Sequence, residues 1–173
     1  MMPRDADQQV LLPVSPLFIA LTLVVALAVN LLPLGRHPAQ PDLLALVLLF
    51  WSMHQPQRVG LGLAFGFGLV MDVHQGALLG QHALAYALLG YFAAVAHRRL
   101  LSFSVAAQTA QVLPLFAASH AAALLVRLLA GGMFPGWNLF YAPLVEALLW
   151  PVAGWVLLAP QRRPPDPDGN RPL

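Results

Sequence analysis

The sequence contains no cysteine and no lysine, and it is unusually poor in charge. Only 9% of its 173 residues are Asp, Glu, Lys or Arg, whereas soluble domains carry about 25%. Without cysteine the chain forms no disulfide, no thiolate metal site and no cysteine nucleophile. Seven acidic and nine basic residues cannot cover the surface of a soluble domain, and a net charge of +2 does not provide a basic face for nucleic acid. The composition argues against a soluble enzyme, a disordered chain and a nucleic-acid partner.

Hydrophobic residues, by contrast, make up 59% of the chain. They form six apolar segments between Pro, Gly and charged residues: Val14–Leu34, Asp42–His54, Val59–Val73, Ala77–Ala96, Val105–Ala130 and Leu139–Ala159. A membrane-spanning helix needs about 20 mostly apolar residues, and no segment alternates like a membrane strand. We therefore predict an all-α integral membrane protein, a six-helix transmembrane bundle. The second and third segments are short, so they form either two thin spans or one re-entrant pair.

The arginines predict the orientation, because short cytoplasmic loops are enriched in Lys and Arg. Six spans place seven arginines on one side, namely Arg4, Arg58, Arg98, Arg99, Arg162, Arg163 and Arg171, and only Arg36 and Arg127 on the other. A five-span arrangement blurs this division, so the bias favours six. We expect a short cytoplasmic N-terminus at 1–13, a transmembrane domain at 14–159 and a flexible, proline-rich cytoplasmic tail at 160–173. Most Trp residues, and Tyr141, fall near the predicted membrane interfaces.

Small residues recur at spacings that bring helices close together in lipid. Gly60, Ala64 and Gly68 are four residues apart, and Gly62 and Gly66 form a second pair. Gly76 and Gly80 open the fourth segment. These seven residues predict contacts within the bundle, chiefly among its third to fifth helices.

Five ionisable residues fall in the outer half of the predicted membrane, where charge is costly. They are Asp72, His82, His120, Arg127 and Glu146. One interpretation is a structural network in which Arg127 pairs with Glu146, Asp72 caps a helix end and the histidines bond to neighbours. The other is the polar floor of an outward-facing cavity, or a socket for a partner's membrane helix.

Motifs for catalysis are not found. The sequence has neither an H-E-x-x-H zinc pair nor a G-x-S-x-G nucleophile elbow. Single histidines in membrane spans more often make packing hydrogen bonds than bind metal. We predict no catalytic residue, no metal site and no cofactor, so we expect that the chain is not an enzyme.

Two stretches around the predicted third and fourth helices carry a family resemblance. Asp72-Val73 closes one helix, and Gly76-Ala-Leu-Leu-Gly80-Gln-His82-Ala-Leu84 opens the next. Arg98-Arg99 and Ala147-Leu-Leu-Trp-Pro151 fit the same pattern. In these residues the chain resembles the MreD family of bacterial rod shape-determining proteins, over about residues 13–163. It departs from that pattern at 102–111 and at Glu146.

The resemblance implies a non-enzymatic scaffold subunit in the bacterial inner membrane, within the rod complex that controls peptidoglycan synthesis and cell shape. Its implied partner is an MreC-like single-span protein. Through this protein it would connect indirectly to a RodA-type glycosyltransferase, a class B penicillin-binding transpeptidase and MreB filaments. The resemblance also implies a fold similar to the substrate-binding subunits of energy-coupling-factor transporters. The polar cluster of Asp72, His82, Arg127 and Glu146 also supports an alternative, a small-solute-binding transporter subunit. A membrane-embedded hydrolase is a weaker third hypothesis.

Overall fold

The computed structural model describes residues 14–32 and 40–161 of the chain, and these ranges contain helices but no strand. The six α-helices are α1 (Pro16–Leu31), α2 (Leu43–His54), α3 (Leu61–Gln75), α4 (Gln81–Leu101), α5 (Val105–Leu129) and α6 (Tyr141–Leu158). Short 3-10 helices, η1 (Trp137–Phe140) and η2 (Ala159–Gln161), flank α6. The predicted all-helical class is confirmed. The terminus at 1–13, and the expected tail beyond Gln161, lie outside the described residues.

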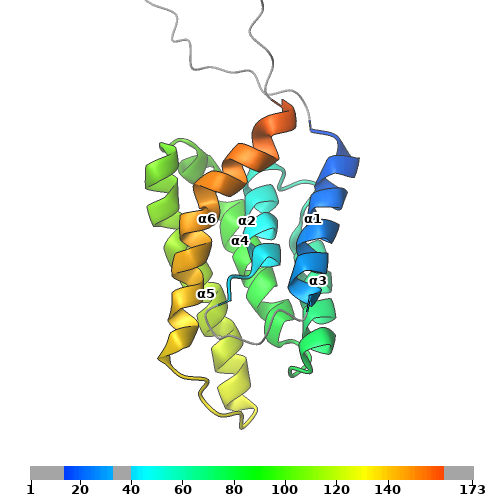
Figure 1. Cartoon of the computed structure of the whole chain (residues 1–173), viewed down its shortest axis with the longest axis vertical. Coiled ribbons are helices and arrows are strands. Elements are labelled where there is room, and N and C mark those ends of the chain that lie inside the picture. Colours follow the sequence, from blue (N-terminus) through cyan, green and yellow to red (C-terminus); the bar gives the residue numbers. More distant parts are fainter. Residues whose placement is uncertain (1–13, 33–39, 162–173) are drawn as a thin grey trace, which may run out of the picture.

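The helices run alternately up and down the long axis of the bundle (Figure 1). The start of α1 and the end of α6 lie at one end, which we call the terminal end, together with the α2–α3 and α4–α5 connections. The α3–α4 and α5–α6 connections lie at the opposite end, the loop end. This alternation agrees with the segment order predicted from the sequence.

Local capping signals explain why the helices begin and end near the predicted positions. The hydroxyl of Ser15 accepts the N–H of Phe18 at 3.1 Å, and the carboxylate of Asp42 accepts the N–H of Ala45 at 2.9 Å. Such side chains satisfy amides that have no partner in the first turn of a helix. Gly76 ends α3 in the left-handed conformation, at φ +60°, where an L side chain is unfavourable.

The core is built around α2, which packs against α1, α4 and α6. Nine of its twelve residues are buried, so the helix has no polar face. Trp51 lies within this core instead of at an interface, and its indole N–H donates to the Thr22 hydroxyl at 2.9 Å. Both α2 and α3 pack chiefly against α4, and they are separate helices joined by a short connection at the terminal end.

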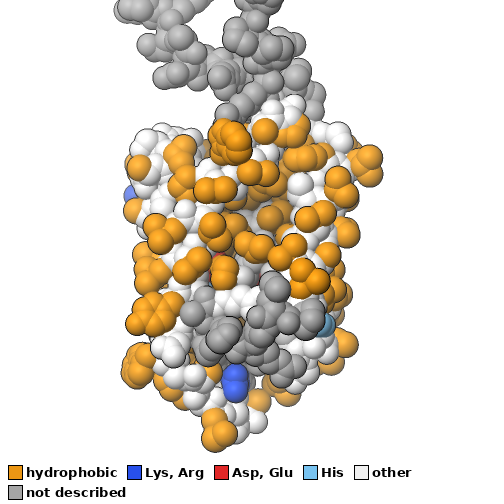
Figure 2. Space-filling model, viewed as in Figure 1, with side chains coloured by type: hydrophobic (Ala, Val, Ile, Leu, Met, Phe, Trp, Pro, Cys, Tyr) orange, Lys and Arg blue, Asp and Glu red, His pale blue; other side chains and the backbone are white. Residues whose placement is uncertain are grey.

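Large apolar side chains are exposed on α1, α3, α4, α5 and α6, and Figure 2 shows that hydrophobic side chains cover much of one face of the bundle. Large exposed side chains include Leu17 on α1, Val73 on α3, Val95 on α4, Leu129 on α5 and Leu148 on α6. Two helical stretches, α5 and Trp137–Gln161, are long and apolar enough to cross a membrane, and α1 and α2 are shorter apolar helices. An exposed surface of this composition is typical of a helical bundle surrounded by lipid.

The small residues singled out in the sequence have three different positions. Ala64 and Gly68 lie at the α3–α4 contact, where a Cβ on Gly68 would come within 2.3 Å of the Ala83 Cα. Gly76 and Gly80 are turn residues with φ of +60° and +104°. The other three face outward, because a Cβ added there would meet no atom within 4 Å: Gly60, Gly62 and Gly66. The predicted contacts within the bundle are therefore seen at Ala64 and Gly68, but not at these three residues or at Gly76 and Gly80.

Candidate functional site

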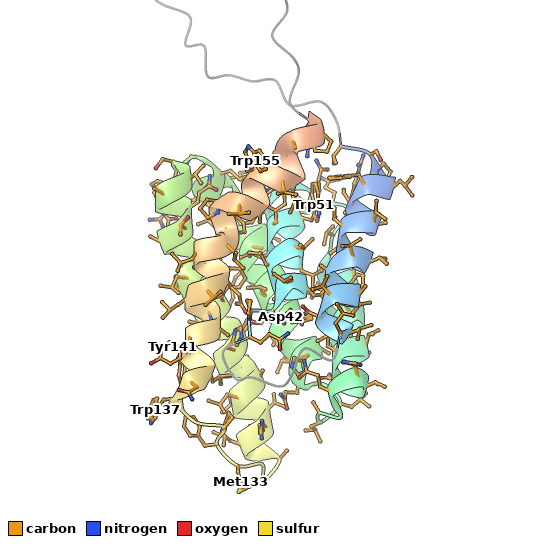
Figure 3. All side chains as sticks on the ribbon, viewed as in Figure 1. Asp42, Trp51, Met133, Trp137, Tyr141 and Trp155 are labelled. Atoms are coloured by element: carbon orange, nitrogen blue, oxygen red, sulfur yellow. The ribbon has the colours of Figure 1, made fainter. Side chains whose placement is uncertain are left out.

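A network of polar side chains lies inside the bundle toward the loop end, and Asp42 is at its centre (Figure 3). Asp42 Oδ1 accepts from the Asn30 amide at 2.6 Å and from the Ala45 N–H at 2.9 Å. Its Oδ2 accepts the hydroxyl of Tyr86, which is buried on α4. Asn30 in turn accepts the N–H of Leu43 at 3.2 Å. One carboxylate thus connects α1, α2 and α4.

Glu146 extends this network to α5 and α6. Its side chain is 0% exposed, and its Oε1 accepts the backbone N–H of Asp42 at 2.8 Å. The same oxygen lies 3.4 Å from His120 Nε2 on α5. Glu146 Oε2 is buried without a hydrogen-bond partner among the described residues, and buried polar atoms of this kind are rare in folded proteins.

A third carboxylate, Asp72, connects the end of α3 to the start of α4. It is 0% exposed, and it accepts the N–H groups of Gly80 at 2.7 Å and of His82 at 2.6 Å. Its Oδ1 is also 2.8 Å from His82 Nδ1. Asp72 therefore caps α4 from outside the helix. The αL glycines Gly76 and Gly80 allow the intervening turn to fold back over the carboxylate.

A cavity of about 1160 Å³ opens beside the Asp42 carboxylate. Asn30, Asp42 and Tyr86 line it from one side, and His82, His120 and Arg127 line it from α4 and α5. Apolar side chains, including Leu31, Leu78 and Leu124, complete the wall. Further polar side chains also line it, namely Gln40, His74, Gln75, Gln81 and Ser119, so the cavity wall is a mixture of apolar and polar surface.

The five predicted polar residues separate into two pairs and a single residue. Asp72 contacts His82, and His120 contacts Glu146. The expected pairing of Arg127 with Glu146 is replaced by the contact with His120. Arg127 lies on α5 seven residues beyond His120, about two turns nearer the loop end. It is exposed and lines the cavity instead.

Three residues of the network were missed in the sequence: Asn30, Asp42 and Tyr86. Asn30 and Tyr86 are uncharged, and Asp42 was taken only as the first residue of an apolar segment. Two signals were nevertheless present. An amide in the last turn of an apolar helix and an acid directly before the next helix both require polar partners if they lie in lipid.

The chemistry of the network is hydrogen bonding between helices. Within residues 14–32 and 40–161, no three His, Cys, Asp or Glu side chains are placed to hold a metal ion. Asp42 and Asp72 are both occupied with internal donors. The arrangement connects five helices, α1, α2, α4, α5 and α6, around one polar centre and leaves a cavity beside it.

An all-helical bundle with an apolar exterior and an internal polar network is the architecture expected of a helical membrane protein. Comparison with known proteins then gives the family. The sequence model of the family described as rod shape-determining protein MreD matches residues 8–158. The chain therefore belongs to the MreD family. The resemblance read from Asp72-Val73 and 76–84 is confirmed, and it assigns the chain a role in determining rod shape.

A curated relative supports the same assignment. The rod shape-determining protein MreD of Haemophilus influenzae is 31% identical over 126 residues, which cover 73% of this chain and 76% of the relative. No solved structure matches the chain. The similarity to energy-coupling-factor transporter subunits therefore stays a prediction.

Proposed function

We propose that this protein is a non-enzymatic scaffold subunit of the cell-elongation machinery in the bacterial inner membrane, and that it acts by binding the transmembrane helix of an MreC-like partner. The observation that carries the proposal is membership of the MreD family across nearly the whole helical body. Through that partner the chain would connect to a RodA-type glycosyltransferase, a class B penicillin-binding transpeptidase and MreB filaments.

The outward face of α3 supports binding by helix contact. Gly62 and Gly66 lie one turn apart and are exposed, and a Cβ at either position would meet nothing within 4 Å. Exposed glycines at this spacing allow the backbone of another helix to approach closely in lipid. We therefore assign this glycine face of α3 to the partner helix.

Co-purification tests both parts of this proposal. The full chain, extracted in mild detergent, should retain a co-expressed MreC-like protein. Gly66→Ile should abolish retention, while Ala121→Ile, an equivalent enlargement at an exposed position of α5, should leave it intact. A wild-type chain that does not retain the partner contradicts the scaffold proposal. Equal retention by both variants contradicts only the assignment to α3.

A cellular experiment tests the shape-determining role independently. Clean deletion of the gene should convert rods to round cells, and expression of the wild-type chain should restore the rods. Normal rods after deletion would contradict the role. The Gly66→Ile variant should fail to restore shape if partner binding is what the role requires.

The membrane arrangement forms part of the same proposal, namely six spans with both termini in the cytoplasm. The alternating helices and the arginines near the terminal end support it, since Arg58 follows α2 and Arg98 and Arg99 close α4. Exposed Trp155 lies toward the terminal end, and exposed Trp137 and Tyr141 lie toward the loop end, as aromatic belts would (Figure 3). A reporter that works only in the cytoplasm should be active when it is fused after Gln161. A reporter that works only outside the cytoplasm should be active when it is inserted at 131–136.

A further inference from the structure

The cavity at the loop end is larger than the helix contacts around it require. Its volume of about 1160 Å³ exceeds the range of roughly 300–1,000 Å³ typical of pockets for small organic ligands. It lies between the ends of α1 and α3 and the facing sides of α4 and α5. A space of this size beside a hydrogen-bonded polar network can admit a guest molecule.

The carboxylates next to the cavity are poorly suited to hold a cationic guest. Asp42 lines the cavity, but its oxygens already accept from Asn30, Ala45 and Tyr86. Asp72 is fully buried, and its oxygens accept two strong backbone bonds and the His82 ring. An ammonium group entering the cavity would therefore find at most one unused acceptor site on Asp42 Oδ2, so an amine ligand is disfavoured.

The polar groups that remain available include one strong donor, the guanidinium of Arg127, and one ring nitrogen of His82. Arg127 is the one arginine in the cavity wall that the structure describes. Within residues 14–32 and 40–161 its guanidinium makes no ion pair, and residues 33–39 contain no acid. His82 donates through Nδ1 to Asp72, because a carboxylate only accepts, so its Nε2 is left for a ligand.

The spacing of Arg127 and His120 along α5 indicates the length of a guest molecule. Arg127 and His120 lie seven residues apart on one face of α5, which is about 10 Å along the helix axis. Ala123 and Leu124 lie between them on α5, and Leu78 adds apolar surface from the α3–α4 connection, so part of the wall near these two groups is apolar. A molecule that fills this space would carry a charged group at one end and an apolar body.

We propose that the cavity binds an organic oxyanion, a carboxylate or a phosphate on a partly apolar body, with Arg127 holding the anion and His82 Nε2 bonding to the body. Guanidinium matches both oxyanions because it offers parallel N–H donors. The ligand is either a soluble metabolite or the headgroup of an anionic lipid. This inference does not depend on binding of an MreC-like partner.

Thermal unfolding of the full chain in an uncharged detergent tests the proposal. The probes are hexanoate, glycerol phosphate and dihexanoyl phosphatidylglycerol, and dihexanoyl phosphatidylcholine, whose zwitterionic headgroup has no net charge, is the control. A ligand that binds only the folded state raises the unfolding midpoint, increasingly with its concentration. We expect at least one anionic probe to raise the midpoint by several degrees and the choline lipid to raise it less.

Variants then locate the binding. Arg127→Gln should lose the response, while Arg99→Gln, which removes an exposed arginine at the end of α4, should keep it. Ala123→Leu, which fills the cavity wall, should also lose the response, and it keeps the test valid if Arg127→Gln folds poorly.

The responses to the different probes distinguish a soluble ligand from a lipid headgroup. An Arg127-dependent response to glycerol phosphate or hexanoate indicates a soluble ligand, and a response to phosphatidylglycerol alone indicates a lipid headgroup. Both results support the proposal. No response to any anionic probe, or responses that persist in both Arg127→Gln and Ala123→Leu, overturns it.

Discussion

Glu146 on α6 accepts a hydrogen bond from the backbone N–H of Asp42, 2.8 Å away, and this bond joins the last helix to the start of the second. The N–H belongs to the residue whose own carboxylate contacts α1 and α4. Positions 42 and 146 therefore act as one unit, although 104 residues separate them. The stability of the loop end depends on this unit.

Replacing Glu146 tests the bond to Asp42 directly. Glu146→Leu should lower the free energy of unfolding by about 1–3 kcal/mol, because it leaves the Asp42 N–H buried without an acceptor. Glu146→Gln should cost less, since its side-chain oxygen can still accept that N–H. Reversible unfolding in detergent measures both values. Equal stability of the leucine variant and the wild type would show that the bond does not matter.

The hydroxyl of Tyr86 should be among the most valuable polar groups in the bundle, because it donates to the Asp42 carboxylate inside the core. Tyr86→Phe keeps the ring and should cost about 1.5–3 kcal/mol, the range for hydrogen bonds to charged groups. A double-mutant cycle with Asp42→Asn should show coupling. The double variant should lose less free energy of unfolding than the sum of the losses in the two single variants. Simple additivity would mean that the two side chains do not interact.

How far the sequence predicts this site depends on the kind of signal. Helix positions follow from local features such as Ser15, Asp42 and Gly76, which act on the nearest amides and carbonyls. The partner of Glu146 does not follow from local features. His120 and Arg127 share one face of α5, and only the relative depth of α5 and α6 decides which of them reaches the carboxylate. Depth results from packing of the whole bundle.

Removing the Asp72 carboxylate should loosen the start of α4. Asp72→Ala leaves the N–H groups of Gly80 and His82 without their acceptor, and loss of a cap costs about 0.5–2 kcal/mol. Amide exchange at 80–83 should accelerate more than exchange in the middle of α4. His82→Phe, which removes only the ring contact, is the matched control and should leave those amides protected. Unchanged exchange at 80–83 in Asp72→Ala would contradict the capping role.

Two glycines of α3 should respond in opposite ways to the same substitution. They are two residues apart, so Gly68 faces α4 while Gly66 faces outward. Gly68→Ala places a Cβ within 2.3 Å of the Ala83 Cα, and such overpacking should cost about 1–3 kcal/mol. Gly66→Ala meets no atom within 4 Å and should stabilise the helix by about 0.5–1 kcal/mol.

Unfolding midpoints of the two alanine variants, measured without a partner, check this difference. A midpoint for Gly68→Ala at or above the wild-type value would mean that α3 and α4 do not approach as closely as the structure shows. A fall for Gly66→Ala in the isolated chain would mean that its outward face already contacts part of the protein. Stability gained at Gly66 in isolation, together with loss of a co-purified partner in Gly66→Ile, would separate folding from binding at one position.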